Sequence, residues 1–329
     1  MSDTTRILPA DAVKAAAREV GFSACGLTAA RPVSDERAQK FRRWLAEGCH
    51  ADMDYLARNA DKRLDPRLLV EGARTIVSVA VNYFTPDEMG DFAIQSAGGM
   101  GENAWTIARY ARGTDYHDVV KQMLRELMLK LGLAEGVDGR CFVDTAPIDE
   151  KYWAQQCGLG WKGRNSQLIV PGAGSYFFLG ELVLTLDTDR HDAPMASRCG
   201  TCHRCLEACP AQALRGDGEL DARRCLSYLT IEHRGPLPKG TGRQMGTCIY
   251  GCDRCNDACP WNVRFASPTR VAELQPRAAI LSMTPEGWQR LTVEQYRTLF
   301  RRSAVKRAKI EGLTRNIAAV ASAQRHEEE

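Results

Sequence analysis

The sequence predicts an α/β domain, built as an α+β sandwich, that is followed by a cysteine-rich module and a short helical segment. Three observations support this order. Segments with strand and helix periodicity alternate up to about residue 190, nine of the 13 cysteines lie between positions 199 and 259, and helical periodicity returns after Pro260. We expect domains at 1–195, 196–262 and 263–329.

Each element of the first domain has a local signal. The apolar, β-branched residues of 75–84 predict a buried strand, and the amphipathic segment 115–131, which Gly132 ends, predicts a helix. Ser34 is the expected N-cap of another helix. In chain order we expect helices at 10–21, 34–48, 115–131 and 149–157, a short buried strand or turn at 23–28, and strands at 75–84, 140–144, 167–170 and 176–186. The Gly- and Asp-rich segment 86–103 predicts a long loop, and the final HEEE a polar tail.

Composition excludes several classes of protein. Lys and Arg number 44 and Asp and Glu number 41 in 329 residues, so the net charge of +3 does not by itself demand a nucleic-acid partner. No apolar run approaches the length of a transmembrane helix, so we expect no membrane association. The first residues lack the apolar core of a signal peptide. We therefore expect a cytoplasmic protein whose cysteines are not a disulfide framework.

Two cysteine runs predict iron–sulfur clusters. CGTCHRCLEACP has the spacing C-x2-C-x2-C-x3-C before Pro210, and CDRCNDACP carries three cysteines before Pro260. The first spacing is that of bacterial ferredoxins, in which the fourth cysteine ligates the other cluster. Zinc is the alternative, but zinc sites usually take two separated cysteine pairs. We therefore predict a bacterial ferredoxin-like module with two [4Fe–4S] clusters.

Crossing the fourth cysteine of each run predicts the ligands. The first cluster receives Cys199, Cys202, Cys205 and Cys259. The second receives Cys209, Cys252 and Cys255 and needs one more thiolate, since Ile249 stands where a further cysteine would be. Cys225 and Cys248 are the candidates, and we favour Cys225 because an expected helix at 221–231 can bring it in. A mixed or three-iron second cluster is the alternative.

The clusters need a partner centre at which chemistry occurs. No G-x-G-x-x-G follows a strand and no G-x-x-x-x-G-K-[ST] or G-x-S-x-G is present, so nucleotide cofactors and a serine nucleophile receive no support. A second redox centre is therefore expected in the first 190 residues. Between Arg301 and Arg315 six basic residues accompany one acidic residue, which predicts either a solvated helix face or a phosphate-binding face for RNA.

Several blocks of the sequence resemble one known family. They are RYARGTDYH at 109–117, DTAP at 144–147, GLGWKGRNS at 158–166, GSYFFLG at 174–180, YGCDRCNDACPWN at 250–262 and RRSAVKRAKIEGLTRN at 301–316. In this order, from about residue 10 to 316, the chain is similar to epoxyqueuosine reductase.

The resemblance implies a function. Such enzymes bind cobalamin in the α/β domain beside two [4Fe–4S] clusters, and remove the epoxide oxygen from epoxyqueuosine in the wobble position of tRNA, the last step of queuosine synthesis. It further implies Cys225 as the remaining cluster ligand, a basic HEAT-like C-terminal segment that contacts tRNA, an external electron donor and a monomer. A reductive dehalogenase, which shares the module order, and a ferredoxin-type electron-transfer protein are the alternatives.

The resemblance also implies site residues. Asp144 matches the proposed proton donor, and we expect burial against the corrin to raise its pKa; a turn or N-cap role is the alternative. Expected cofactor or tRNA contacts are Arg63, Tyr110, Asp144, Lys162, Arg164, Asn165, Ser227, Asp253 and Arg254, each of which could instead serve a turn. Gly158, Gly160 and Gly163 predict a loop whose backbone closely approaches a ligand. We expect His117 to be a capping or packing residue and not a cobalt ligand.

Overall fold

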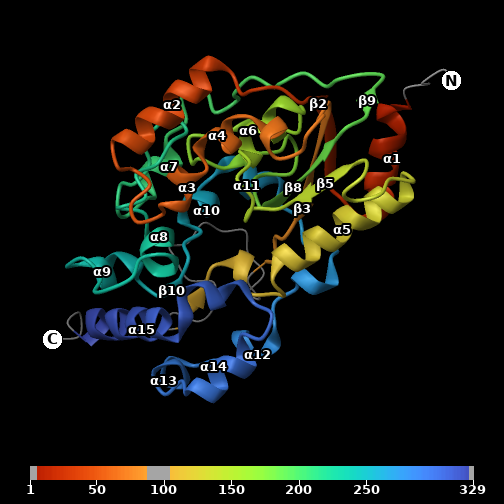
Figure 1. Ribbon diagram of the computed structural model, residues 1–329. Coiled ribbons are helices and arrows are strands. Elements are labelled where there is room, and N and C mark those ends of the chain that lie inside the picture. Colours follow the sequence, from red (N-terminus) through yellow and green to blue (C-terminus); the bar gives the residue numbers. More distant parts are fainter. Residues whose placement is uncertain (1–5, 87–103, 326–329) are drawn as a thin grey trace. The chain divides into compact units, whose positions relative to one another are not determined.

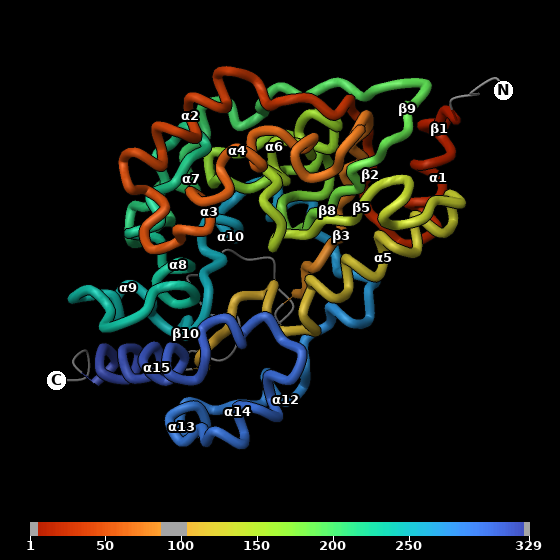
Figure 2. Tube along the Cα trace, viewed as in Figure 1, coloured from red at the N-terminus to blue at the C-terminus, as the bar shows by residue number. Residues whose placement is uncertain are grey.

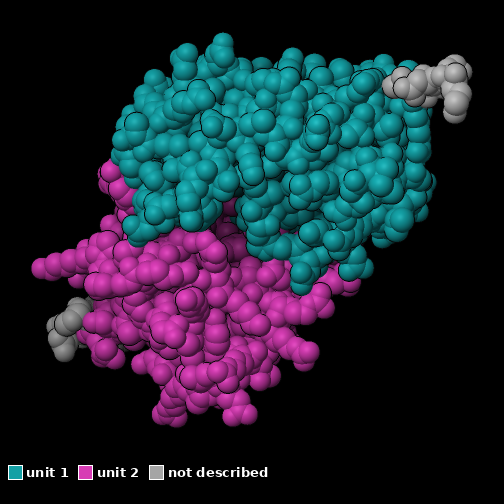
Figure 3. Space-filling model, in the orientation of Figure 1, with its two compact units in different colours: residues 1–82, 117–163, 167–200 teal, residues 83–116, 164–166, 201–329 magenta. Residues whose placement is uncertain are grey.

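The computed structural model describes residues 6–86 and 104–325, which form two compact units (Figure 3). Unit 1 comprises 1–82, 117–163 and 167–200, and unit 2 comprises 83–116, 164–166 and 201–329. The cysteine-rich module and the C-terminal segment expected at 196–262 and 263–329 thus lie almost entirely in one unit. Apart from Pro86, the loop expected at 86–103 lies outside the described residues, as does the HEEE tail.

Unit 1 is built on a four-stranded antiparallel sheet (Figure 1). Its order is β2 (Ala24–Ala29), β3 (Thr75–Asn82), β8 (Phe177–Leu184) and β5 (Gly139–Phe142). Every neighbouring pair is antiparallel, so the alternating helices do not connect parallel strands. The α+β sandwich is therefore the description that fits. In the register Ser78 and Phe142 both lie opposite Glu181, at the middle of the sheet.

Helices cover both faces of this sheet. The main ones are α1 (Ala10–Val20), α2 (Asp35–Ala46), α5 (Tyr116–Lys130) and α6 (Glu150–Gln156). Trp153 of α6 packs in one buried cluster with Leu179 and Val183 of β8. On the other face, a Cβ at Gly180 would lie 2.9 Å from Val120 of α5, so this glycine allows α5 to approach. Because strand residues alternate, Glu181 faces the same side as Leu179 and Val183, toward α6.

Short elements complete unit 1 (Figure 2). They are α3 (Tyr55–Arg58), α4 (Ala60–Leu64), η1 (Pro66–Leu68), the hairpin of β6 (Trp161–Lys162) and β7 (Leu168–Ile169), and the parallel pair of β1 (Ile7–Leu8) and β9 (Asp187–Thr188).

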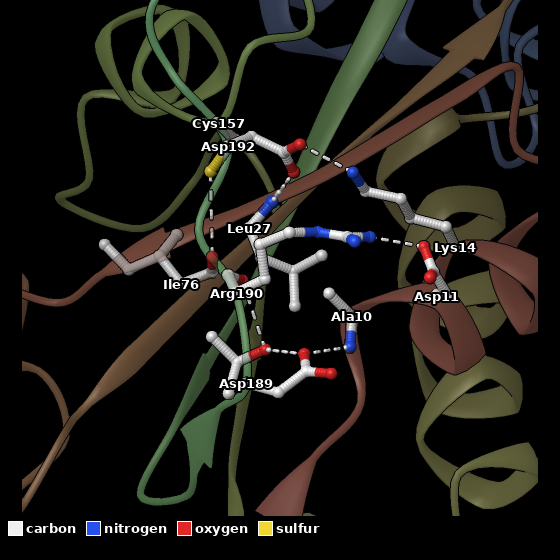
Figure 4. A network of polar contacts seen from close by, with 10 residues as sticks. Ala10, Asp11, Lys14, Leu27, Ile76, Cys157, Asp189, Arg190 and Asp192 are labelled. Carbon is white, nitrogen blue, oxygen red and sulfur yellow. Dashed lines mark hydrogen bonds and ion pairs between the residues drawn. The ribbon is translucent and has the colours of Figure 1, made fainter.

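Carboxylates after β9 attach the chain to α1 and β2 (Figure 4). Asp192 accepts the amide of Leu27 at 2.9 Å and forms an ion pair of 2.6 Å with Lys14. Asp189 accepts the amide of Ala10 at 2.8 Å, and Arg190 pairs with Asp11. The segment that precedes Cys199 is thus fixed at its start.

Unit 2 is mostly helical. Its first elements are β4 (Thr106–Ile107), η2 (Arg109–Ala111), α7 (Arg204–Glu207), α8 (Leu226–Ile231), α9 (Thr241–Met245), β10 (Cys248–Tyr250), α10 (Arg254–Asp257) and α11 (Pro260–Phe265). There follow η3 (Ala272–Leu274), α12 (Ala278–Leu281), α13 (Pro285–Gln289), α14 (Val293–Leu299), η4 (Ala304–Ala308) and α15 (Lys309–Arg325). Within 6–86 and 104–325, none of the helices is both long and apolar enough to span a bilayer.

The last helix, α15, is built into unit 2. It packs against α8, α9 and β10. The fully buried Asn316 donates hydrogen bonds to the carbonyl oxygens of Thr230, at 2.8 Å, and Ile249, at 3.0 Å. Arg315 donates to the carbonyls of Leu229 and His233. Because these donors satisfy buried carbonyls of α8 and β10, the C-terminal helix supports the cysteine-rich module.

Candidate functional site

The two cysteine runs have matching local structures. The cysteine before the last one in each run, Cys205 or Cys255, lies in a four-residue helix, and these helices, α7 and α10, pack against each other. Cys259 is the N-cap of α11, with Pro260 in the first helical position. Proline suits that position because its missing N–H has no helical acceptor. Each run therefore places its thiols around one tight loop and a single helical turn.

The thiols assigned to the second cluster influence one another electrostatically. Burial, and after it the charges of Cys252, Cys225 and Cys209, raise the pKa of Cys255 well above its usual value. The sulfur of Cys209 accepts the amide of Ala213 at 3.3 Å. Mutually repelling, desolvated thiolates are unstable without a cation, whereas iron binding displaces their protons. The donor chemistry therefore fits an iron–sulfur cluster.

The structure distinguishes the surroundings of the two candidates for the fourth ligand. Cys225 is the N-cap of α8, and its backbone angles (φ −69°, ψ 122°) nearly equal those of Cys259 (φ −73°, ψ 122°). Cys248 instead directs its thiol to the carbonyls of Tyr250, at 3.4 Å, and Gly251, at 3.3 Å. The helix expected at 221–231 begins only at Leu226. Its start was misplaced because Asp221 forms a turn by accepting the amide of Arg223 at 3.1 Å.

The boundary between the two units falls inside the first cysteine run. Cys199 belongs to unit 1, which ends at Gly200, and Cys202, Cys205 and Cys259 belong to unit 2. Cys205 and Cys259 are buried. Over the described ranges, no three His, Cys, Asp or Glu side chains converge closely enough to share one metal ion. The assignment of these four ligands stays a prediction.

Asp144 lies in a strained turn directly after β5. Its φ of +29° is in the left-handed region, which is unfavourable for a non-glycine residue. Its amide donates to Oε1 of Glu150 at 2.5 Å, and its Oδ2 lies 3.4 Å from Nε2 of His117. The side chain is 55% exposed. The protein's own atoms therefore do not bury this carboxyl group as we expected. His117, the second residue of α5, lies beside the Asp144 carboxyl group as well as in the first turn of the helix.

Two further acids lie behind Asp144, and sequence reasoning missed both as site residues. Burial, and after it the charge of Asp144, raise the pKa of Glu150 to about 8. Burial, and after it the charge of Glu150, raise the pKa of Glu181 well above its usual value. Glu181 is fully buried; its Oε1 accepts the hydroxyl of Ser78 at 3.2 Å, and its Oε2 has no hydrogen-bond partner among the described residues. The available signal was a lone glutamate inside the apolar strand 176–186.

Basic residues support the same turn. Arg63 donates to the carbonyl of Ile148 at 2.8 Å, and Arg37 forms an ion pair of 2.6 Å with Asp149, the N-cap of α6. Burial raises the pKa of Asp149, but the charges of Arg37 and Lys162 outweigh this and the net shift is downward. Unit 1 thus brings together three of the predicted contact residues, Arg63, Asp144 and Lys162.

The other predicted contact residues lie in unit 2, where each side chain or backbone has a local contact. Asp253 accepts the amide of Arg109 at 2.7 Å, and Arg254 donates to the carbonyl of Gln244 at 2.6 Å. The remaining contacts are Tyr110 to the hydroxyl of Tyr250, Asn165 to Oδ1 of Asn256, Arg164 to the carbonyl of Gly216, and the carbonyl of Ser227 to the hydroxyl of Thr230. Their roles toward a cofactor stay predictions.

Two glycines approach protein backbone closely. A Cβ at Gly160 would lie 2.0 Å from the carbonyl oxygen of Ile169, and one at Gly158, whose φ is +72°, would lie 2.9 Å from that of Ala193. Gly163 donates its amide to Gln167 at 2.7 Å and closes the hairpin. Packing within unit 1 therefore accounts for Gly158 and Gly160, and the approach of this loop to a ligand stays a prediction.

Only some of the basic residues between Arg301 and Arg315 are exposed to solvent. Arg301, Arg302, Lys306 and Lys309 are exposed, whereas Arg315 is half-buried against backbone carbonyls. Arg307 is exposed but forms an ion pair of 2.8 Å with Glu232. The phosphate-binding face expected here is thus narrower than the run of charges.

Comparisons with known proteins identify the family. Residues 198–262 match the model described as "4Fe-4S double cluster binding domain", and residues 63–145 match "Epoxyqueuosine reductase QueG, DUF1730". The chain is 42% identical to an epoxyqueuosine reductase of Cyclobacterium marinum over 307 residues (93% of this chain and 94% of the relative), and 43% identical to that of Leadbetterella byssophila over 309 residues (94% and 97%).

Solved structures agree. An epoxyqueuosine reductase bound to an epoxyqueuosine-modified tRNA-Tyr stem loop is 25% identical with a TM-score of 0.83, covering 95% of this chain and 80% of that one. A Bacillus subtilis structure, with an aspartate-bearing catalytic loop swung out of the active site, is 26% identical with a TM-score of 0.81, covering 95% and 81%. The chain belongs to the epoxyqueuosine reductases, a family of oxidoreductases.

Proposed function

We propose that this protein reduces epoxyqueuosine to queuosine in tRNA, with electrons passing from two [4Fe–4S] clusters to cobalamin. The observation that carries the proposal is the likeness to epoxyqueuosine reductases over more than nine-tenths of the chain. One solved relative holds an epoxyqueuosine-modified tRNA stem loop, which supports the same substrate here.

The reaction has a definite demand for electrons and protons. Converting an epoxide to an alkene releases its oxygen as water and consumes two electrons and two protons. A [4Fe–4S] cluster carries one electron at a time, so two clusters together match one turnover. Eight cysteines in the crossed assignment supply the ligands. An external donor must reduce the clusters, because the amino-acid side chains described here are not a source of electrons.

The predicted contact residues fit cobalamin by their chemistry. The corrin carries amide groups and the nucleotide tail a phosphate. Both can form hydrogen bonds with side chains of the kinds found at Arg63, Tyr110, Lys162, Asn165, Ser227, Asp253 and Arg254. When bound, cobalamin supplies a strongly reducing cobalt centre. The protein's part is to bind and orient the cofactor and substrate, exclude water and deliver protons.

Asp144 is the proposed proton donor in this reaction. It lies in the DTAP block, in a strained turn whose side chain is exposed enough to reach a bound substrate. We expect Asp144→Asn to retain both clusters and cobalamin and to lose turnover by about 100-fold or more, the usual contribution of a general acid. Queuosine formation from modified tRNA measures the loss, and retained activity would assign Asp144 to the turn alone.

The proposal is tested on anaerobically reconstituted protein. Iron, sulfide and cobalt are quantified, and epoxyqueuosine-containing tRNA is then incubated with a low-potential chemical reductant. We expect four irons for each of two clusters, one cobalt per chain after cobalamin addition, and queuosine in the tRNA digest. Zinc in place of iron, no retention of cobalamin, or clusters that reduce but form no queuosine would each contradict the proposal.

A further inference from the structure

An exposed aspartate needs a physical reason to hold a proton. An ordinary aspartic acid ionises near pH 3.9, far below the pH of the cell interior. Burial is one way to retain the proton, but 55% of the Asp144 side chain is exposed. The other way is a negative charge nearby, because two carboxyl groups that share a site do not readily both ionise. The groups that face Asp144 therefore decide whether it can donate.

Glu150 is placed to share such a site with Asp144. It begins α6, six residues after Asp144, and the chain between them forms the turn that brings its Oε1 to 2.5 Å from the Asp144 amide nitrogen. After burial, the charge of Asp144 is the second largest influence on the ionisation of Glu150, so the two carboxyl groups repel each other. The contact thus joins them in two ways, by a hydrogen bond to the backbone and by repulsion between the side chains.

The row of acids continues into the sheet. Glu181 lies at the centre of β8, on the face that α6 covers, and one of its two oxygens has no hydrogen-bond partner among the described residues. A buried carboxylate without partners is unfavourable, so Glu181 is held neutral. If Glu181 is neutral, only Asp144 and Glu150 among these three acids can carry the negative charge.

We propose that Glu150 is a positioning residue for reduction: it fixes the Asp144 turn through the amide hydrogen bond, and its carboxyl group shares with Asp144 the one proton that Asp144 delivers to the substrate. On delivery the proton leaves the Asp144 carboxyl group for the released oxygen, both carboxyl groups become anionic, and solvent returns one proton to the pair. This inference rests on the proposed function, since it names how the proposed proton donor stays loaded.

Other charged groups near Asp144 and Glu150 influence how readily the two carboxyl groups ionise. Lys151 of α6, Arg63 of α4 and the hydrogen bond from the Asp144 amide favour the Glu150 carboxylate and so oppose the repulsion, whereas Glu181 of β8 is neutral and adds no charge. Asp149, the N-cap of α6, is already paired with Arg37. His117 of α5 favours the Asp144 carboxylate only when its imidazole is protonated, so its effect weakens as the pH rises. The net result of burial and repulsion is a pKa for Glu150 of about 8, so the pair holds its proton at neutral pH.

The variant Glu150→Gln tests the two proposed roles of Glu150 separately, namely sharing a proton with Asp144 and fixing the Asp144 turn. Glutamine keeps an oxygen that can accept the Asp144 amide, but it carries neither charge nor exchangeable acid proton. In wild type, turnover should fall as the pH rises through about 8. In the variant Asp144 ionises without its like-charged neighbour, so that fall should move by about two pH units or more toward acid. At pH 7.5 we expect about 100-fold lower kcat with an unchanged KM for tRNA.

Glu126→Gln is the matched control, because Glu126 is an exposed residue of α5 in the same unit. It should leave the pH profile unchanged. Glu150→Ala, which also removes the acceptor of the Asp144 amide, should lose more activity than Glu150→Gln. All variants should bind iron and cobalamin as wild type does.

A second readout needs no turnover. Carbon-13 NMR of carboxyl-labelled glutamate, on the oxidised, cluster-loaded full chain without tRNA, should show one glutamate titrating near pH 8. That signal should vanish in Glu150→Gln and move to lower pH in Asp144→Asn. An unmoved midpoint in Asp144→Asn, or an unaltered pH profile in Glu150→Gln, would overturn the inference. A wild-type enzyme that forms no queuosine would overturn the proposed function instead, while the NMR titrations would still decide whether the pair exists.

Discussion

Individual residues show which parts of the site a sequence can and cannot reveal. Asp144 could be proposed as a site residue because it lies in the DTAP block. Glu150 could not, since an acid at the start of a helix is common and its contact with the Asp144 amide depends on a left-handed turn that the sequence does not specify. Glu181 gave a stronger signal, because its strand neighbours predict a buried position for a side chain that usually avoids one.

Glu181 should make the stability of the fold depend on pH. Its pKa is raised in the folded state, so between the unfolded and folded pKa values only the folded chain holds the proton, and stability falls as the pH rises. Glu181→Gln removes this contribution, and its stability relative to wild type should increase by up to about 1.4 kcal/mol per pH unit above pH 4.5. Thermal unfolding across a pH series measures the difference. Parallel curves for the two proteins would mean that Glu181 is not held neutral.

At the scale of elements, sequence periodicity predicted the type and position of helices and strands better than the way in which the strands pair. The helices expected at 10–21, 34–48 and 115–131 are α1, α2 and α5, and the strand expected at 75–84 is β3. The antiparallel order of the sheet was not predictable from alternation of helices and strands, because strand direction depends on which distant strands pair. The start of α8 was misplaced for a local reason, the turn at Asp221.

The position of Cys225 before α8 leads to a paired test. Cys225→Ser should lose one cluster, about half of the bound iron, because Cys225 shares the N-cap geometry of Cys259 and its charge acts on Cys255. Cys248→Ser should keep both clusters, because its thiol is directed at backbone carbonyls. Iron and sulfide analysis with electron paramagnetic resonance of the reduced proteins provides the measurement. The reverse pattern would identify Cys248 as the ligand.

The whole molecule divides differently from the linear order of its predicted domains. Residues 83–116 and 164–166 lie in the same unit as the cysteine-rich module, although they precede it in the sequence. Composition and motif spacing cannot show this, because both describe neighbours along the chain. Spacing predicts seven of the eight cluster ligands, because a cubane takes thiolates at short, fixed intervals, and it leaves Cys225 and Cys248 as candidates for the eighth. This assignment stays a prediction.

The exposed part of the basic segment should contribute to tRNA binding. Replacing Arg301, Lys306 and Lys309 by glutamine should weaken tRNA affinity and reduce the slope of log affinity against log salt by about 0.7–0.9 for each lost phosphate contact. Arg307 and Arg315 are left intact because they bind Glu232 and backbone carbonyls. The matched control replaces Arg18, Arg43 and Lys121, exposed residues of unit 1, and should keep the wild-type slope. Equal slopes in both triple variants would make the segment a solvated face.

The hydrogen bonds from Asn316 to Thr230 and Ile249 limit how far this enzyme can be shortened. A protein truncated before Lys309 would lack Asn316. The buried carbonyl groups of Thr230 in α8 and Ile249 in β10 would then lose a hydrogen-bond donor. Because Cys225 is the N-cap of α8, we expect such a truncation to impair assembly of the iron–sulfur clusters. This defect should be measurable before any loss of affinity for tRNA.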